Sequence, residues 1–261
     1  MKAAILQLRV SDGETAEMRW ARVEQLLAGL DGERVDVVML PELWSVGFCN
    51  YDGYAAAAEP LRGATVLRLS PWARSLHSHI LTGSFVEQAP DGRRYNTMAM
   101  LDANGYVLGR YRKIHLFGYA SRERELLTPG TQTGEIFTPY GVIGLATCYD
   151  LRFPEQFRRM TDNGATMFAV SAAWPRERLD DWRLFCRVRA LENQSFLLAC
   201  NHAGSCGGST GAGHSMAVAP DGTVLAEAGA EEQVLTVSLD LNEAQRFRRQ
   251  FPALHDRVPI G

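Results

Sequence analysis

Short apolar runs alternate with helical patterns along the whole chain, and this alternation constrains the fold more than any other feature. The segments whose length and β-branched content are typical of buried strands are 2–9, 35–41, 80–87, 141–147, 166–173 and 195–201. The segments with helical spacing are 14–30, 65–78, 153–162 and 180–193. Strands that alternate with helices in this way predict an α/β layer architecture.

Two dipeptides predict hairpins, so the sheets are expected to be mixed rather than purely parallel. Asn104-Gly105 is a strong signal for a type I′ turn, and Asp221-Gly222 closes a second hairpin. The strands flanking these turns, together with the last strand of the chain, are expected at 96–103, 106–112, 214–219, 223–228 and 233–239. Antiparallel pairs therefore accompany the parallel strands that the helical crossovers imply.

The length of 261 residues allows one large domain or two small ones. No fixed-period repeat, low-complexity segment or linker divides the chain, so 1–261 is predicted to be a single domain. A hydrophobic fraction of 46% with 22% charged residues is ordinary for a globular protein and argues against disorder. The net charge of -3 and the lack of a basic run indicate no nucleic-acid partner and no membrane surface.

The N-terminal apolar stretch is interrupted by Gln7 and Arg9, which argues against a secretory signal, and no apolar segment has transmembrane length. The five cysteines are few, odd in number and scattered, which is not typical of a disulfide framework. We therefore expect a protein of the reducing cytoplasm.

Two of the three candidate catalytic segments are ambiguous when taken alone. Glu42 comes directly after the strand that ends at Leu40, where open α/β sheets place their sites. A surface-loop or helix N-terminal glutamate is the simpler interpretation of that residue by itself. Lys113 lies between aromatic and aliphatic neighbours in 111–117, where a desolvated ammonium could be held near an acid. Taken alone, an ordinary surface cation on an edge strand is the simpler interpretation of this residue as well.

Cys148 is the most specific candidate, because an apolar strand runs directly into it and a helix opens shortly afterwards near Pro154. A nucleophile on such a turn is held rigidly, and the backbone N–H groups of the turn are available to an oxyanion. An ordinary cysteine titrates near pH 8.5, so a nucleophilic thiol needs a base or a cation beside it. The alternative is that Cys148 is a small buried hydrophobic residue.

These three segments, taken together in this order, resemble the nitrilase superfamily of carbon–nitrogen hydrolases. The matching stretches are Pro41-Glu42, 112–116, 148–155 and 213–216, so the resemblance extends over nearly the whole chain. It implies a four-layer α-β-β-α sandwich with two mixed β-sheets. It also implies a homodimer, for which we place the interface on the helix at 179–193, including Trp182, Phe185 and Val188, and on the terminal segment 251–254.

The resemblance also assigns catalytic roles. It makes Cys148 the nucleophile, Glu42 the general base and Lys113 the stabiliser of the tetrahedral intermediate. The backbone N–H of Tyr149 would complete the oxyanion hole. Glu123 matches an auxiliary glutamate, although Glu125 is close enough in sequence to compete for this role.

The pocket residues are less specific. Trp174, Asn201 and His202 match segments that line the pocket in the family. Arg176 and Arg178 follow Trp174 and could bind a substrate carboxylate, although exposed arginines are common. A short dicarboxylate monoamide would suit them.

The function implied is hydrolysis of a small-molecule amide to ammonia and a carboxylate through a cysteine thioester, with neither a metal nor an organic cofactor. A nitrilase, an N-carbamoyl amine hydrolase and a non-catalytic interaction protein of the same fold remain alternatives. A serine nucleophile at Ser215 is disfavoured because a strand and a hairpin turn follow it, where a nucleophile elbow needs a helix. A metal site drawn from Cys200, His202, Cys206 and His214 lacks the paired spacing of structural zinc sites.

Overall fold

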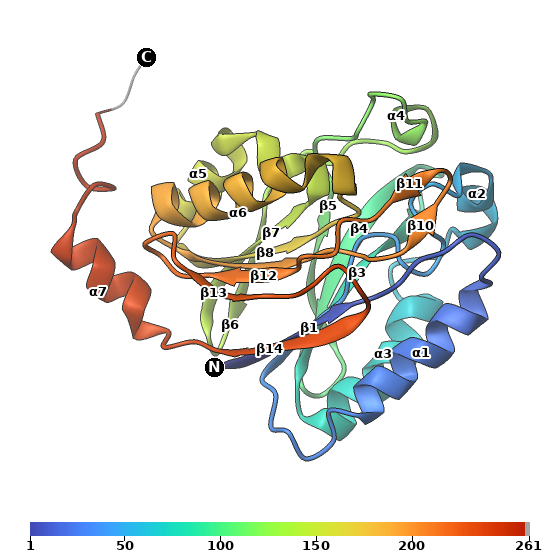
Figure 1. The fold of residues 1–261 in the computed structure, drawn as a ribbon, viewed down its shortest axis with the longest axis horizontal. Helices are drawn as coiled ribbons and strands as arrows, with labels where there is room; N and C mark the ends of the chain where they lie inside the picture. Colours follow the sequence, from blue (N-terminus) through green and yellow to red (C-terminus); the bar gives the residue numbers. More distant parts are fainter. Residues whose placement is uncertain (259–261) are drawn as a thin grey trace.

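A computed structural model describes residues 1–258, and in it two six-stranded mixed sheets pack face to face (Figure 1). The first sheet has the strand order β14-β1-β2-β3-β4-β5. Its members are β1 (Lys2–Gln7), β2 (Val37–Met39), β3 (His79–Gln88), β4 (Arg94–Leu101), β5 (Val107–Arg112) and β14 (Gln233–Ser238). β1, β2 and β3 are parallel, and the remaining strands of this sheet pair antiparallel.

The second sheet repeats this arrangement with the order β13-β12-β9-β8-β7-β6. Its members are β6 (Gly134–Thr138), β7 (Gly141–Thr147), β8 (Ala165–Ser171), β9 (Phe196–Cys200), β12 (Met216–Val218) and β13 (Val224–Glu227). β7, β8 and β9 are parallel, and their neighbours on both sides are antiparallel. The carboxyl ends of β2, β7 and β8 meet across the sandwich, where the Glu42 N–H donates to the Ala172 carbonyl oxygen at 3.4 Å.

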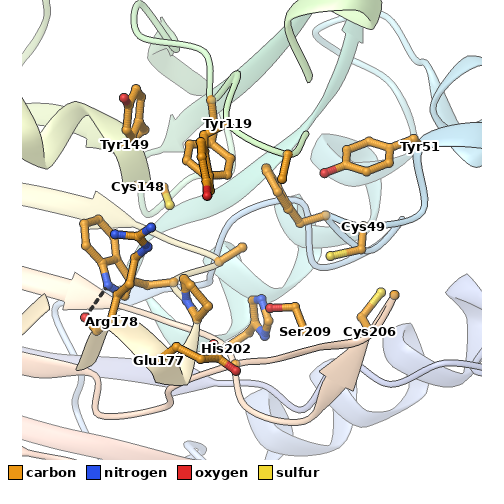
Figure 2. Close-up of a pocket in the computed structure, with 18 of the residues that line it drawn as sticks. Cys49, Tyr51, Tyr119, Cys148, Tyr149, Glu177, Arg178, His202, Cys206 and Ser209 are labelled. Atoms are coloured by element: carbon orange, nitrogen blue, oxygen red, sulfur yellow. Dashed lines mark hydrogen bonds between the residues drawn. The ribbon is translucent and has the colours of Figure 1, made fainter. Parts of the chain in front are cut away.

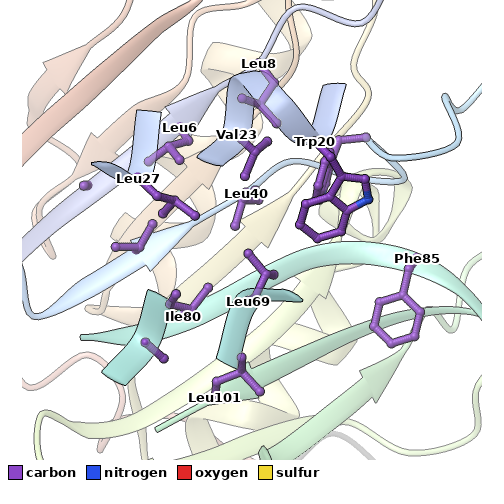
Figure 3. Close-up of a cluster of buried hydrophobic side chains, with 14 of the residues drawn as sticks. Leu6, Leu8, Trp20, Val23, Leu27, Leu40, Leu69, Ile80, Phe85 and Leu101 are labelled. Atoms are coloured by element: carbon purple, nitrogen blue, oxygen red, sulfur yellow. The ribbon is translucent and has the colours of Figure 1, made fainter. Parts of the chain in front are cut away.

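Helices cover the outer face of each sheet. α1 (Ala16–Ala28) and α3 (Ala64–Leu76) lie on the first sheet, and α5 (Pro154–Asp162) and α6 (Leu179–Asn193) lie on the second (Figure 1). The side-chain period of β1 explains the layering, because successive residues point to opposite faces of a strand. Leu6 packs toward Val23 and Leu27 of α1 (Figure 3), whereas Ile5 faces Leu145 between the sheets. The predicted α-β-β-α sandwich is confirmed.

Several short elements went unpredicted because they are too short for a periodic pattern. They are α2 (Tyr54–Ala57), α4 (Glu123–Leu126), β6, β10 (Ser205–Cys206), β11 (Ser209–Thr210) and three 3₁₀ turns at Tyr51–Gly53, Cys148–Arg152 and Arg176–Arg178. α7 (Asn242–Gln250) was missed as well, and it extends from one end of the sandwich (Figure 1). It is tied back by the guanidinium of Arg248, which donates to the carbonyl oxygens of Ala165, Asn193 and Gln194.

The hairpin at Asn104-Gly105 is present, but its turn is not of type I′. That type requires positive φ at both central residues, and only Gly105 has it, with φ 79°. The carboxylate of Asp102 accepts hydrogen bonds from the N–H groups of Asn104 and Tyr106, at 2.9 and 2.8 Å. The Asp102 side chain therefore stabilises a turn in which only Gly105 has a left-handed backbone conformation.

The placement of Trp182 at a dimer interface is wrong. Its indole is fully buried against the Trp174 ring, with 5.6 Å between the ring centroids, and it donates to the His214 carbonyl oxygen at 2.7 Å. Helical periodicity gives an apolar face but does not say whether that face meets the sheet or a partner. The exposed apolar side chains of α6 are Leu184 and Leu191. Across residues 1–258, no helix is long and apolar enough to cross a membrane.

Candidate active site

Glu42 follows β2 on a backbone that is shaped by close contact with β3. The Pro41 carbonyl oxygen accepts the Ser84 N–H at 3.2 Å, and Ser84 Oγ accepts the Leu43 N–H at 3.0 Å. Gly83 makes this contact possible, since a Cβ at that position would lie 2.1 Å from the Pro41 carbonyl oxygen. The carboxylate of Glu42 therefore enters the gap between the sheets, and Glu42 is only 1% exposed to solvent.

Lys113 follows β5 and meets two carboxylates in the same buried space. Its Nζ lies 2.8 Å from Glu42 Oε1 and 2.9 Å from Glu123 Oε2, and all three side chains are inaccessible to solvent. The Asn96 side-chain amide donates to both carboxylates, at 2.8 and 2.9 Å. Glu125, the alternative to Glu123, has a side chain that is 70% exposed and lies beside Arg122. Glu123 is therefore the glutamate that contacts the lysine.

Cys148 lies at the point where β7 turns into a 3₁₀ helix. Its φ of 47° is rare for a residue with a side chain, and such conformations cluster at functional sites. The buried carboxylate of Asp150 stabilises the turn by accepting the Thr147 N–H at 2.8 Å and the Tyr111 hydroxyl at 2.7 Å. Tyr149 is the second residue of this 3₁₀ helix, and first-turn N–H groups have no acceptor within their own helix.

The electrostatics of the cluster follow from one cation between two carboxylates. Burial by itself lowers the pKa of Lys113, but Glu123 and Glu42 outweigh it and raise that pKa above its ordinary value. Burial raises the pKa of Glu123, while Lys113 acts in the opposite direction. Burial, followed by the neighbouring Glu42, also raises the pKa of the Cys148 thiol. The resting site therefore contains a protonated lysine and a protonated thiol.

A cavity of about 510 Å³ opens above this cluster (Figure 2). Cys148, which is 8% exposed, reaches it, and Tyr149 and Ala173 also line it. Glu42 lies behind this wall, with Oε2 accepting the Ala173 N–H at 3.0 Å. A molecule in the cavity can therefore touch the thiol while the acid and the lysine stay shielded from water.

The predicted pocket residues divide into three groups. Trp174 and His202 line the cavity. Asn201 is not among the lining residues, but its side chain holds the Trp174 backbone by accepting from the N–H at 2.7 Å and donating to the carbonyl oxygen at 3.2 Å. Arg176 does not line the cavity, whereas Arg178 does (Figure 2). Arg176 begins the 3₁₀ turn and Arg178 ends it, so the two side chains leave the turn in different directions.

Sequence reasoning missed two other residues of the site. Asn96 is a buried polar residue in a strand that continues with Met98 and Met100, and a polar residue within an apolar strand is a signal that could have identified it. Arg152 lines the cavity with its guanidinium 5.1 Å from the Trp174 ring centroid. In the sequence it stands out only as one position of the 148–155 motif.

The rival sites do not assemble. Ser215 is buried, and its hydroxyl accepts the Asn201 N–H at 2.9 Å before the chain enters β12. Cys200 directs its thiol to the Leu6 carbonyl oxygen, and His214 pairs with Glu227. Within residues 1–258, no group of three or more His, Cys, Asp or Glu side chains is placed to hold a metal ion.

A four-layer sandwich that buries a lysine between two glutamates beside a cysteine at its strand ends is typical of a hydrolase. Comparison with known proteins identifies the family. The yeast Nit3 structure, from Saccharomyces cerevisiae and described as a member of branch 10 of the nitrilase superfamily, superposes with a TM-score of 0.85. The yeast chain is 29% identical in sequence, and the superposition covers 97% of this chain and 94% of the yeast chain. The fold is therefore that of the nitrilase superfamily.

Relatives in sequence agree with this assignment. The 2-oxoglutaramate amidase of Bacillus subtilis (strain 168) is 37% identical, covering 96% of this chain and 95% of that protein. The 2-oxoglutaramate amidase of Paenarthrobacter nicotinovorans is 34% identical, covering 98% and 89%. The profile of the family described as Carbon-nitrogen hydrolase matches residues 2–249. The chain belongs to this family, and it is an amidase-type hydrolase.

Proposed function

We propose that this enzyme hydrolyses the terminal amide of a short, carboxylate-bearing monoamide through a thioester on Cys148. The observation that carries the proposal is the buried contact of Lys113 with Glu42 and Glu123 directly behind the cysteine. Amide hydrolysis needs a nucleophile, a proton carrier and a positive site for the oxyanion, and these groups supply all three.

The first step forms the thioester. Cys148 Sγ attacks the amide carbon, the carbonyl π electrons move to the oxygen, and the thiol proton passes to the Glu42 carboxylate. The ammonium of Lys113 and the N–H of Tyr149 stabilise the oxyanion. When the carbonyl re-forms, the C–N bond breaks and Glu42 gives its proton to the departing nitrogen. Ammonia leaves, and the acyl group remains on sulfur.

The second step regenerates the enzyme. A water molecule attacks the thioester carbon and gives a proton to Glu42, which forms a second tetrahedral intermediate. Its collapse breaks the C–S bond, and the sulfur takes the proton from Glu42. The products are the carboxylic acid and the free thiol, so Glu42 ends each half-reaction as a carboxylate. Glu123 keeps Lys113 charged while Glu42 is protonated, because its carboxylate remains on the ammonium.

The cavity supports an anionic substrate. Arg178 and Arg152 line it on the side of Trp174, and guanidinium groups bind carboxylates in a bidentate manner. Arg152 is held by Asp181 at 2.8 Å, whereas Arg178 is 3.9 Å from the same carboxylate and has a half-exposed side chain. Arg178 is therefore the freer of the two to receive a substrate carboxylate. The two bacterial relatives are named as amidases of 2-oxoglutaramate, a monoamide of this kind.

The experiment is ammonia release from 2-oxoglutaramate, from a neutral amide of similar length, from the matching nitrile and from an N-carbamoyl amine. We expect the anionic amide to be the best substrate and intact-mass analysis to trap its acyl group on the wild type. Cys148→Ala should lose both signals. Cys186→Ala is the matched control, because Cys186 is also a buried cysteine but lies in α6 and does not line the cavity. Ammonia release by Cys148→Ala would disprove the thioester route.

We also propose that the enzyme is a homodimer that pairs through α6 and the terminal segment 251–254. The support is the exposure of Leu184, Leu191 and Phe251, at 60%, 48% and 61%. Light scattering should give twice the single-chain mass of 28.9 kDa. Leu184→Glu should shift the enzyme toward the single-chain mass, whereas a wild type that is monomeric at micromolar concentration would exclude the dimer.

We further infer that residues 1–261 form one catalytic domain that works in the cytoplasm. Both sheets share the apolar layer between them, which supports a single cooperative unit. All five cysteines are free thiols, as a reducing compartment maintains them. A single unfolding transition followed by two probes, and recovery of the activity in the soluble cytoplasmic fraction, are the expected results.

A further inference from the structure

Two thiols other than the proposed nucleophile meet on the opposite wall of the cavity. Cys49 lies between β2 and the 3₁₀ turn at Tyr51–Gly53, and Cys206 ends β10. Both line the cavity, and Figure 2 shows the two side chains on the same side of it. The two thiols are close enough for each to shift the pKa of the other. The mechanism above uses neither of them.

The backbone around this thiol pair is shaped for close approach. Gly207 has φ +60°, and a Cβ there would lie 2.6 Å from Cys49 Cβ, which real side chains do not tolerate. Only glycine allows the β10–β11 hairpin to come this near to Cys49. The Gly207 N–H donates to both carboxylate oxygens of Asp12, at 3.0 and 3.2 Å, which fixes the hairpin from its other side.

The surroundings make the two thiols unequal. Contact with the Cys49 thiol lowers the pKa of Cys206 to about 7, with a smaller contribution from Arg19, while burial and Asp12 act in the opposite direction. The same contact raises the pKa of Cys49. The contact between the two side chains therefore favours the thiolate form of Cys206 and the thiol form of Cys49. Cys206 is only 7% exposed, but it lines the cavity, and a thiolate on a cavity wall next to a second cysteine is an arrangement that favours oxidation.

We propose that Cys49 and Cys206 form a reversible disulfide when the enzyme meets a peroxide. The Cys206 thiolate attacks one peroxide oxygen, the O–O bond breaks, and hydroxide leaves with the electron pair, so that the cysteine becomes a sulfenic acid. Cys49 then attacks the Cys206 sulfur, the S–O bond breaks, and water leaves with the Cys49 proton. The hydroxide takes up the proton that Cys206 released on ionising, so in sum two thiols are oxidised to a disulfide, one hydrogen peroxide is reduced, and two waters form.

The disulfide would connect two walls of the cavity. One is the segment that follows Glu42, and the other is the β10–β11 hairpin, whose residues Gly207 and Ser209 also line the cavity. Cys148 is on a different element and is held as a thiol, so the cross-link forms without using the nucleophile. The proposal depends on the thiol pair alone and not on which substrate the enzyme hydrolyses.

The test is peptide mapping of the full-length enzyme after treatment with hydrogen peroxide and blocking of the remaining thiols. Trypsin, which cleaves after lysine and arginine, releases Cys49 in residues 35–62 and Cys206 in residues 190–246. We expect these two peptides to be joined, lighter by two hydrogens than their sum, and separated again by dithiothreitol. The Cys148 peptide, residues 125–152, should carry the blocking group.

Cys200 lies in the same tryptic peptide as Cys206 and provides the matched control. Its thiol is fully buried, 3.3 Å from the Leu6 carbonyl oxygen. Cys200→Ala should still form the cross-link, whereas Cys49→Ser and Cys206→Ser should not. Because the peptide map of the wild type requires no substitution, misfolding of a variant leaves that measurement intact. Free thiols on both peptides of the oxidised wild type, or a cross-link through Cys200, would overturn the proposal.

Discussion

Replacing Lys113 with methionine tests the charge arrangement of the site through stability as well as activity. Methionine approximates the apolar stem of lysine but leaves Glu42 and Glu123 buried together, with only the Asn96 amide between them. Removing one partner of a buried ion pair costs about 3–5 kcal/mol, because the remaining charge has no counter-ion. A domain has about 5–15 kcal/mol in total, so Lys113→Met should be much less stable than the wild type near pH 8.

The loss of stability caused by Lys113→Met should increase as the pH rises. Without Lys113, burial and mutual repulsion hold the folded-state pKa of at least one of the two carboxyls above its unfolded value of about 4.3. The folded variant then binds more protons than the unfolded chain. The contribution of this proton to the free energy of unfolding is at its maximum below about pH 4.3. Above that pH it falls by about 1.4 kcal/mol per pH unit for one proton, until the pH reaches the folded-state pKa. The penalty should therefore be smaller near pH 5 than near pH 8.

Urea unfolding of both proteins at these two pH values measures the difference. The double variant Lys113→Met with Glu123→Gln should recover much of the stability near pH 8, because it removes one of the two carboxylates. It should not recover turnover, since loss of an oxyanion-stabilising group costs on the order of 10²–10³ in rate. An equal free energy of unfolding for Lys113→Met and wild type near pH 8, with no trend toward pH 5, would refute the buried charge cluster.

Three further substitutions address separate parts of the site. Glu42→Gln should lower kcat by about 10²–10⁴, because Gln cannot carry a proton, and circular dichroism should show an unchanged fold. Asp150→Asn should lower the free energy of unfolding by about 1–3 kcal/mol in urea, because an amide nitrogen cannot accept the hydrogen bonds that this buried carboxylate receives. Arg178→Met should raise KM about tenfold for an anionic amide and leave KM for a neutral amide nearly unchanged, since one charge-assisted hydrogen bond is lost. Equal effects on both amides would place Arg178 outside the substrate site.

Local patterns were sufficient for the fold class, whereas the four-layer sandwich and the catalytic roles followed from the resemblance of the motifs to a known family. Apolar runs of strand length, helical spacing between them and two hairpin dipeptides predicted a mixed α/β fold, because these signals depend only on neighbours along the chain. Cys148 directly follows a buried strand and Glu42 comes shortly after one, and the ends of parallel strands carry the sites of such folds. For Glu42, this position alone did not outweigh the simpler interpretation as a surface or helix N-terminal residue. A resemblance in motif order then connected Lys113 to them.

Other features were decided only by packing between the two sheets. Glu123 rather than Glu125 contacts Lys113 because α4 turns the first inward and the second toward solvent. Trp182 belongs to the core because the apolar face of α6 meets the second sheet. The amide of Asn96 reaches two carboxylates from strand β4, 54 and 27 residues away in the chain.

The meeting of Cys49 with Cys206 has the same origin. These thiols come from a loop after the first sheet's β2 and from a hairpin after the second sheet's β9, so only the stacking of the two sheets brings them together. A sequence period states which face of an element is apolar, and a turn signal states where the chain reverses. Neither one states which polar side chains come into contact between faces, because that depends on how the sheets stack and on the strand register. The sequence by itself therefore determined the layers and the turn that carries the proposed nucleophile, and the tertiary structure decided the partners of each charged group and thiol.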